Sequence, residues 1–401
     1  MTIARTAALS AALGLALLCS PGTANAQERQ IKITGFGAMS GVVRSFGINS
    51  KAALEAAADQ INKAGGVTLG DGAKGKIVVD FLDDRCNAEE GISVLRRIAS
   101  GDVLVAIGPT CSNVAEPLFG VLQKKVGDAG DTGLQFPVFT DVAVKLGLAK
   151  ISEWSFRNVP NEMDMYASLF KWLKATKPDL KSLYGGVEEN FAHSRATWYS
   201  VMKEVAAKEG FEVKGESKWL LEDTNFSNQA REAKKADADI IAIAAHPFST
   251  CGMLKEMARQ GVKPKLVIGL TSSSSMETMQ GCAGEAEAVI IPTSFAPVNE
   301  QARAAASAVD KFKGSLDLHS GAAWENVFIL KKIIEDEKVM AKPDTLKADR
   351  EKIRAGLAKL TTTDGLLGKS TRTPDREAVK PYLFVHAKAG KWEVLHTPAV
   401  N

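Results

Sequence analysis

Apolar residues recur along the chain at two spacings, which predict strands and helices in alternation. The run 31–34 predicts a short strand that ends in glycines. Apolar residues at 54, 57, 58 and 61 then follow the i, i+3, i+4, i+7 spacing of one helix face. In the rest of the first third of the chain we expect a helix at 92–98 and strands at 77–82, 103–107 and 136–140. This β-α-β-α order predicts a parallel sheet covered by helices on both faces.

The same alternation starts again near residue 182. There we expect strands at 182–187, 213–220, 239–245 and 266–269, with helices at 193–208 and 228–236. After Pro292 we expect helices near 303–313, 323–336 and 347–360, and a last strand at 382–387. The predicted fold class is therefore α/β, with two Rossmann-like lobes, each a mostly parallel sheet flanked by helices, joined by a hinge.

The N-terminus has the pattern of a secretory signal peptide, which we expect over 1–26. Arg5 supplies the positive charge, the run 7–18 is apolar, and small residues precede the expected cleavage after Ala26. One alternative is an anchor helix, for which the apolar run is too short. Another is a lipoprotein modified at Cys19, where two leucines stand in place of the expected small residues. The signal peptide predicts a periplasmic protein whose mature chain begins at Gln27.

Composition narrows the classes of partner. The chain has 50 Lys and Arg against 47 Asp and Glu, a formal net charge of +3, with both signs interspersed. Because no basic stripe forms, nucleic acid is not an expected partner. Among the five histidines none stands at metal-ligand spacing to another, so we expect neither a metal nor a cofactor.

Four cysteines remain after the expected cleavage, at Cys86, Cys111, Cys251 and Cys282. An even number in an exported protein predicts disulfides, because the periplasm is oxidising. Four cysteines allow three pairings. None of them forms a C-x-x-C motif, which argues against a zinc or thioredoxin-type site.

A glycine-rich segment at 35–41 follows the first expected strand. Its spacing is G-x-G-x-x-x-G, and residues 42–45 separate it from the helix. A dinucleotide fingerprint needs G-x-G-x-x-G with the helix N-terminus directly after the glycines. We therefore interpret this segment as a loop that borders a cleft, with Phe46 as a hydrophobic wall.

Polar residues stand at the carboxyl ends of several expected strands, where ligands bind in open α/β sheets. They are Ser112 with Asn113, Thr140, His246 and Thr271. Simple roles fit as well: helix or strand-end caps for Ser112, Asn113 and Thr140, and a structural histidine for His246. No G-x-S-x-G or H-E-x-x-H motif surrounds these residues, so we do not expect an enzyme.

Five segments, in order along the chain, carry a resemblance to a known family. They are Gly37-Ala38-Met39-Ser40-Gly41 with Phe46, Asp59-Gln60-Ile61-Asn62 with Ala64-Gly65-Gly66, Asp83-Asp84-Arg85-Cys86, Gly108-Pro109-Thr110-Cys111-Ser112 and Ala283-Gly284-Glu285-Ala286. Together they resemble segments of the leucine/isoleucine/valine-binding protein family. Its members are type I periplasmic solute-binding proteins of ABC transporters. The resemblance covers nearly all of the mature chain. It implies that Cys86 pairs with Cys111, whereas Cys251–Cys282 rests only on the even count.

The resemblance also implies a ligand site. Ser112 and Thr140 would hold a ligand carboxylate, with Val138 between them, and Phe46 and Phe191 would be aromatic walls. Thr271 stands where the family usually has the acid that binds a ligand ammonium, and a buried ammonium without a counter-charge is costly. Two alternatives remain open. Either Glu188 or Glu189 supplies the acid, or the ligand is an aromatic acid, a short carboxylate, an amide or urea.

By resemblance the protein is expected to be the periplasmic substrate-binding subunit of an ABC importer, and not an enzyme. It would bind an amino acid or related small carboxylate between two lobes, act as a monomer and deliver its ligand to permease subunits. The first lobe is expected over 27–160 with 296–380, and the second over 161–295 with 381–401. Two alternatives are an exported enzyme on a Rossmann-like fold and a sensory ligand-binding protein that feeds a receptor.

Overall fold

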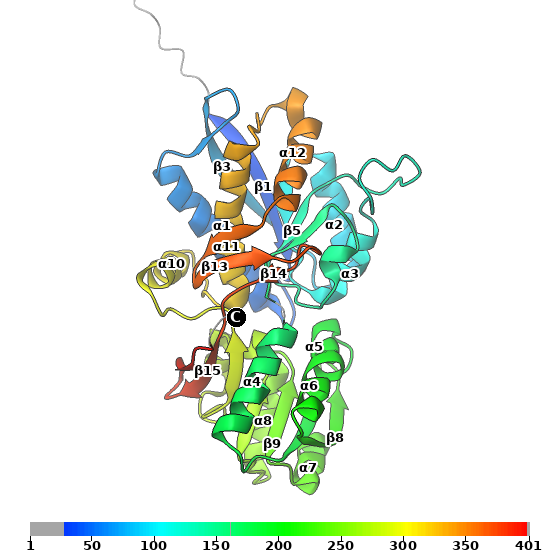
Figure 1. Ribbon diagram of the computed structural model, residues 1–401, viewed down its shortest axis with the longest axis vertical. Helices are drawn as coiled ribbons and strands as arrows, with labels where there is room; N and C mark the ends of the chain where they lie inside the picture. The colour runs from blue at the N-terminus through cyan, green and yellow to red at the C-terminus, as the bar shows by residue number, and fades with distance from the viewer. Residues whose placement is uncertain (1–27, 161, 399–401) are drawn as a thin grey trace, which may run out of the picture.

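The computed structural model describes residues 28–160 and 162–398, and it shows two lobes stacked along the long axis (Figure 1). The expected signal peptide, 1–26, lies outside the described residues. Within them, no helix combines the length and apolar character needed to cross a membrane. The two-lobed α/β class predicted from the apolar pattern is confirmed.

The first lobe is built on a six-stranded sheet in the order β2-β3-β1-β4-β5-β6. All neighbouring strands are parallel except β2, which pairs antiparallel with β3 at the edge. The strands are β1 (Arg29–Gly37), β2 (Val67–Thr68), β3 (Lys74–Asp83), β4 (Val105–Ile107), β5 (Val138–Thr140) and β6 (Ser155–Arg157).

Each face of this sheet packs on its own set of helices and has its own hydrophobic cluster. Because side chains alternate along a strand, Ile31 and Ile33 of β1 enter one cluster and Phe36 enters the other. The first cluster includes α1 (Arg44–Lys63), α10 (Glu300–Asp310), α11 (Leu318–Asp336) and α12 (Leu346–Ala358). The second includes α2 (Ala88–Ser100) and α3 (Ser112–Gly120).

The second lobe is built on a seven-stranded sheet in the order β16-β15-β11-β10-β9-β7-β8. The five strands from β11 to β8 run parallel, and β15 pairs antiparallel with both β11 and β16. The strands are β7 (Ser182–Glu188), β8 (Glu212–Trp219), β9 (Ile240–Ala244), β10 (Leu266–Gly269), β11 (Ile290–Thr293), β15 (Leu383–Lys388) and β16 (Lys391–His396).

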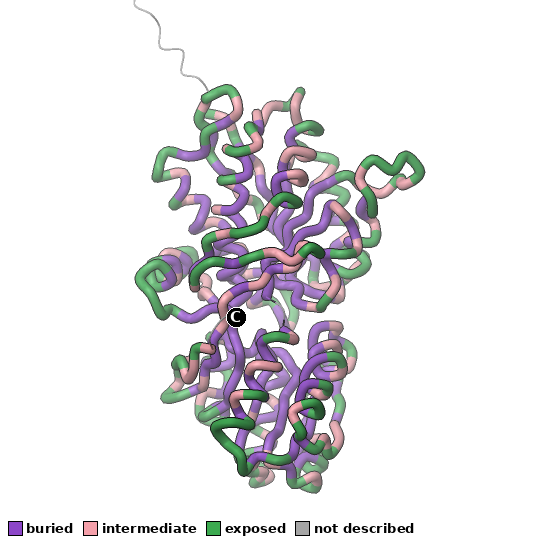
Figure 2. The backbone as a smooth tube through the Cα atoms, viewed as in Figure 1, coloured by how far each residue is buried: buried purple, intermediate pink, exposed green. Residues whose placement is uncertain are grey.

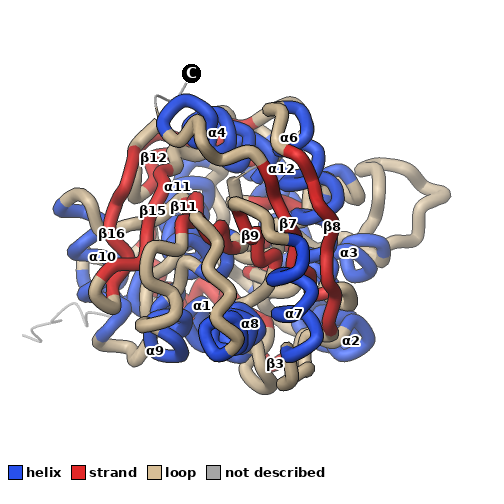
Figure 3. The backbone as a smooth tube through the Cα atoms, turned by 90° about the horizontal axis from the view of Figure 1, so that it is seen from below, coloured by secondary structure: helices blue, strands red, loops and turns tan. Residues whose placement is uncertain are grey.

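Helices cover both faces of the second sheet too, with α4 and α6 on one side and α7, α8 and α9 on the other (Figure 3). The expected helix 193–208 is present, interrupted by a π-helical turn at Trp198–Met202. The helices are α4 (Glu162–Thr176), α5 (Ala192–Thr197), α6 (Lys203–Lys208), α7 (Ser227–Ala236), α8 (Pro247–Arg259) and α9 (Met276–Cys282).

Local sequence accounts for several of these elements. All five residues of β9 are buried, as expected for a central parallel strand covered on both faces. At the start of α2, the Asn87 side chain accepts hydrogen bonds from the backbone N–H groups of Glu89 and Glu90. At the start of α11, Asp317 and Ser320 form a reciprocal capping box.

The apolar pattern missed the shortest elements. It did not predict β2, β6, β16 or the small third sheet of β12 (Thr362–Gly365), β13 (Gly368–Arg372) and β14 (Ala378–Val379). Most of these strands have only two to five residues, so a period of two has little room to appear. Helices α4, α8 and α9 were also not predicted from the apolar pattern.

Three connections join the lobes: between β6 and α4, between β11 and α10, and between β14 and β15. The third sheet lies against this region, since Ala378 of β14 forms a bridge with Pro160 beside the first connection. Figure 2 shows the buried backbone concentrated in the sheets of each lobe and the exposed backbone on the outer helices and loops. Each lobe therefore has its own sheet and core, and one hydrophobic cluster of the first lobe extends across the junction to Phe191 and Leu221.

Candidate functional site

The carboxyl ends of the two parallel sheets meet at the junction between the lobes. In the first sheet β1 lies between β3 and β4, and in the second β7 lies between β8 and β9. These are the points where strand order reverses, which is where open α/β sheets bind ligands. Residues directly after β1, β4, β7 and β9 are thus the natural candidates for a site.

Aromatic rings from both lobes pack against each other at this point. The Phe46 ring of α1 lies 5.5 Å from His246, which follows β9, and 5.3 Å from His319 of α11. Phe191, which follows β7, lies 4.1 Å from the same His246 ring. The structure therefore brings together Phe46, Phe191 and His246, three residues that the sequence predicted from distant segments.

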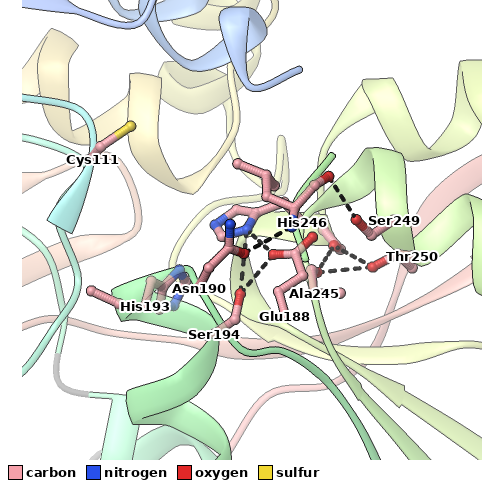
Figure 4. Close-up of polar contacts among 12 residues, drawn as sticks. Cys111, Glu188, Asn190, His193, Ser194, Ala245, His246, Ser249 and Thr250 are labelled. Atoms are coloured by element: carbon pink, nitrogen blue, oxygen red, sulfur yellow. Dashed lines mark hydrogen bonds and ion pairs between the residues drawn. The ribbon is translucent and has the colours of Figure 1, made fainter. Parts of the chain in front are cut away.

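Glu188 ends β7 and is the acid closest to this aromatic group. It is fully buried, and its Oε2 lies 2.5 Å from His246 Nδ1 and accepts a hydrogen bond from the Ser194 hydroxyl at 2.8 Å (Figure 4). Its other carboxylate oxygen, Oε1, has no hydrogen-bond partner. A buried acceptor left without a donor is costly, so a partner is expected from outside the chain.

A second buried acid, Glu162 at the start of α4, has all the donors it needs. His193 Nε2 lies 2.9 Å from its Oε1, the Thr197 hydroxyl donates at 2.5 Å to its Oε2, and the Thr271 hydroxyl donates to Oε1. Burial by itself raises the pKa of Glu162, but His193 and the two hydroxyls outweigh it and lower that pKa. The Thr271 hydroxyl is therefore used to hold Glu162 in place.

His319 is a site residue that the sequence did not indicate. Its side chain is buried at the start of α11, and neither ring nitrogen has a hydrogen-bond partner. Burial lowers its pKa well below the usual range, and the neighbouring His193 and His246 lower it further, so the ring is neutral. A neutral imidazole offers one donor and one acceptor. Among the described residues no group is arranged to hold a metal ion.

The residues predicted to hold a carboxylate lie in the first lobe, but their polar atoms already have partners there. The Thr140 hydroxyl donates to the Pro109 carbonyl at 2.8 Å, and the Ser112 hydroxyl oxygen accepts from the Lys145 backbone N–H at 3.3 Å. The Ser112 hydroxyl proton remains free to donate. Val138 packs in the same hydrophobic cluster as Phe46 and Phe191.

Asn113, also predicted to touch the ligand, forms hydrogen bonds between the two lobes. Its Oδ1 accepts from the Ala192 backbone N–H at 2.6 Å, and its Nδ2 donates to the Asn190 carbonyl at 3.3 Å. At another point of the junction, the Ser45 hydroxyl donates to the Glu277 carboxylate. These two contacts hold the lobes together in a closed arrangement.

The first three residues of the glycine-rich segment that we interpreted as a loop, 35–37, belong to the end of strand β1, and the segment has a packing role there. A Cβ atom at Gly37 would lie 2.3 Å from the Thr110 side chain, whose hydroxyl accepts from the Ala38 backbone N–H. The glycine thus lets the loop approach the segment that follows β4. Helix α1 begins at Arg44 and presents Phe46 at the junction.

Both expected disulfides are present, joining Cys86 to Cys111 and Cys251 to Cys282. Cys111 directly precedes α3, so the first bond fixes the start of the helix that carries Ser112. The second bond joins α8 to α9.

A family model described as a periplasmic binding protein matches residues 30–391 of this chain. The chain belongs to the periplasmic binding protein family. The predicted relationship to Leu/Ile/Val-binding proteins is confirmed by curated relatives, of which one is Leu/Ile/Val-binding protein homolog 3 from Brucella melitensis biotype 1. That relative is 32% identical over 111 residues, which are 27% of this chain and 28% of the relative. The match thus spans less than a third of the relative's own length.

Solved substrate-binding and solute-binding proteins share the fold over 92% of this chain. One is the branched-chain amino acid transporter substrate binding protein LivJ from Streptococcus pneumoniae in complex with isoleucine. It has a TM-score of 0.75 and 20% identity over 92% of this chain and 100% of that chain. Another is a solute binding protein from R. palustris in complex with benzoate, with a TM-score of 0.76 and 16% identity over 92% of this chain and 97% of that chain.

Proposed function

We propose that this protein is the substrate-binding subunit of an ABC importer and encloses a small molecule between its two lobes. Membership of the periplasmic binding protein family supports this role, and so do relatives named for leucine, isoleucine and valine. The ligand is held by Ser112 from the first lobe, by Glu188 and His246 from the second, and by the rings of Phe46 and Phe191. The protein closes over it without chemical change.

The proposal rests mainly on one observation. Buried polar atoms lack a hydrogen-bond partner at the place where the strand ends of the two sheets meet. Glu188 Oε1 and both ring nitrogens of His319 have no partner there, although both side chains are buried. A molecule bound between the lobes would contact side chains of both lobes. Such a ligand binds the closed state more tightly than the open state and therefore favours closure.

The expected partners and location follow from the same role. The mature chain, from Gln27, is a periplasmic monomer, and permease subunits in the inner membrane bind its closed form. The lobes extend over 27–160 with 296–380 and over 161–295 with 381–401, so closure is a rotation about the three connections.

Ligand screening of the mature protein tests this proposal. We expect at least one amino acid, aromatic acid, short carboxylate or amide to raise the melting temperature, because a ligand that binds only the folded state stabilises it. Isothermal titration should then give one site per chain, and the bound compound should be recovered unchanged. Recovery of a converted product would contradict a binding function and indicate an enzyme.

A further inference from the structure

We infer that Glu188 binds a protonated amine of the ligand, so that the substrates are small molecules bearing an ammonium group rather than bare carboxylates. This inference rests on the proposed function, since it concerns the molecule held between the lobes. It assigns to the end of β7 the counter-charge that Thr271 cannot supply.

The position of Glu188 fits this role. It is the last residue of β7, and β7 pairs in parallel with β9 so that Val187 lies opposite Ala244. Glu188, at the end of β7, and His246, shortly after β9, therefore lie at the point where the order of the second sheet reverses. Such a point is where ligands bind in open α/β sheets.

The hydrogen bonds of Glu188 leave one oxygen for a ligand. Ser194 and His246 both contact Oε2, and Oε1 has no partner in a side chain that is fully buried. A carboxylate needs further donors when it is buried, and a protonated amine supplies up to three of them together with the opposite charge.

The other acids near the junction do not have this free capacity. Glu162 receives three donors from His193, Thr197 and Thr271, so both of its oxygens are paired. Glu189 points to the surface, where its side chain is 31% exposed and pairs with Arg195, Lys218 and the Tyr199 hydroxyl. Of the two acids that the sequence offered as alternatives, the contacts therefore favour Glu188.

The surroundings of Glu188 disfavour an anion. Its partners are a serine and a histidine, and the Glu162 cluster next to it also contains no lysine or arginine among its bonded partners. His193 and His246 lie only 5.5 Å apart, so the two acid-containing clusters are adjacent. The unpaired oxygen Oε1 of an ionised Glu188 can only accept a hydrogen bond, so an ammonium group, which donates, fits it, whereas a ligand carboxylate would bring a second acceptor against it.

The aromatic rings around Glu188 also suit a cation with an apolar body. Phe191 and Phe46 both pack against the ring of His246, which itself contacts the Glu188 carboxylate (Figure 4 shows His246 next to Glu188). Apolar rings exclude water and so strengthen a charge pair formed between them. Ring faces also attract cations directly.

Pairs of compounds that differ only in the amine test this inference. The pairs are leucine with 4-methylpentanoate and phenylalanine with 3-phenylpropanoate, titrated by calorimetry against the mature protein at pH 7. We expect the amino member of at least one pair to bind and its deaminated partner to bind at least roughly 30-fold more weakly, as for loss of a buried charge-assisted hydrogen bond.

The variant Glu188→Gln keeps one carbonyl oxygen to accept from Ser194 and His246 and removes the negative charge. It should weaken binding of the amino member by roughly 30- to 1,000-fold while changing the deaminated member little. The matched control is Glu189→Gln, an adjacent acid on the surface, which should leave both affinities unchanged. The melting temperature of each unliganded variant checks that the fold is intact.

Equal or tighter binding of the deaminated acids would overturn the assignment of Glu188 while leaving the proposed binding function in place. The same holds if Glu188→Gln binds the amino member as well as the wild type does. Binding of neither member of any pair, together with no response to amines, aromatic acids, amides or urea, would instead overturn the proposed function and this inference with it.

Discussion

At the scale of single residues, the decisive question is which polar atoms the protein itself already uses. Thr140, Thr271 and Asn113 carry the right groups for a ligand, but each is bonded to another part of the chain. Glu188 and His319 are less obvious in the sequence, yet they keep buried atoms without a partner. Ligand contact is therefore better inferred from incomplete pairing than from residue type.

Burial of acids without a cation also makes stability depend on pH. Asp141, directly after β5, accepts from the Ser50 hydroxyl through one oxygen, and its other oxygen has no partner. Burial, with a smaller contribution from the charge of Asp317, raises the pKa of Asp141 to about 7. Because the folded protein holds this proton more tightly than the unfolded chain, the contribution of Asp141 to stability is greatest below pH 3.8 and is lost as pH rises towards about 7.

The variant Asp141→Asn should therefore lose less stability than the wild type between pH 4 and pH 7.5. A shift of the pKa from 3.8 to about 7 corresponds to a loss of up to about 4 kcal/mol. Urea unfolding of the unliganded protein at several pH values measures the slope. Asp84, whose pKa burial also raises to about 7, should give a comparable change when replaced by Asn. Parallel profiles for wild type and Asp141→Asn would contradict this account.

Part of the site could be predicted at this scale and part could not. Phe46 and His246 could be predicted from the rule that ligands bind at strand ends, whereas Phe191 was indicated only by the family resemblance. His319 stands in the first turn of a helix, where no sequence signal marks it. Its environment arises from α11 packing beside α1, a tertiary contact that local sequence does not encode.

At the scale of elements, the helix starts after β4 and β7 form a contact that closes the molecule. The start of α3 carries Asn113, and its side-chain amide binds both the Asn190 carbonyl and the Ala192 backbone N–H at the start of α5. Neither partner is a ligand atom. The contact should exist only when the lobes are closed.

The variant Asn113→Ala should lower ligand affinity by destabilising the closed state. Two hydrogen bonds at about 1 kcal/mol each would weaken binding by roughly 5- to 30-fold, mainly through faster dissociation. Stopped-flow measurements with the best ligand from the screen give both rate constants. Ser45→Ala removes the other interlobe contact, to Glu277, and should act in the same direction. If Asn113 instead contacts the ligand directly, the loss of affinity in Asn113→Ala would differ strongly between ligands of different shape.

The disulfide between α8 and α9 stabilises the second lobe at the element scale. It joins Cys251 to Cys282, 31 positions apart, and α8 begins directly after His246. Replacing both cysteines by alanine should cost about 3–4 kcal/mol of unfolding free energy, from the greater freedom of the unfolded chain. Urea unfolding without reductant measures this. Dithiothreitol should lower the stability of the wild type more than that of the variant. If it lowers both equally, the stability lost on reduction comes from Cys86–Cys111 and not from Cys251–Cys282.

Elements were predictable to the extent that they are long and periodic. Most helices and strands up to residue 269 follow from apolar spacing because each buries a stripe or face, but α4 and α8 in the same stretch were not predicted. The third sheet, β12 to β14, was not predictable, since it is short and packs against the connections between lobes. Its position depends on where those connections lie in space.

At the scale of the whole molecule, a buried ion pair lies among the connections between the lobes. Lys380, between β14 and β15, pairs with Glu325 of α11, and both side chains are buried. Glu325 also accepts from the Asn158 amide at 3.0 Å and from the Leu366 backbone N–H at 2.8 Å. This network joins the first and third connections to a helix of the first lobe, so it braces the region where the two lobes are connected.

Removing one charge of this pair should therefore cost more than removing both. Glu325→Gln keeps an oxygen to accept from Leu366 but leaves the Lys380 ammonium buried without a counter-charge, at a cost of about 3–5 kcal/mol. The double variant Glu325→Gln with Lys380→Met removes the stranded charge and should recover most of that loss. Unfolding free energies of the wild type, both single variants and the double variant complete the cycle. If the losses of the single variants simply add in the double variant, the ion pair is not coupled, and the hinge instead depends on the separate hydrogen bonds of each side chain.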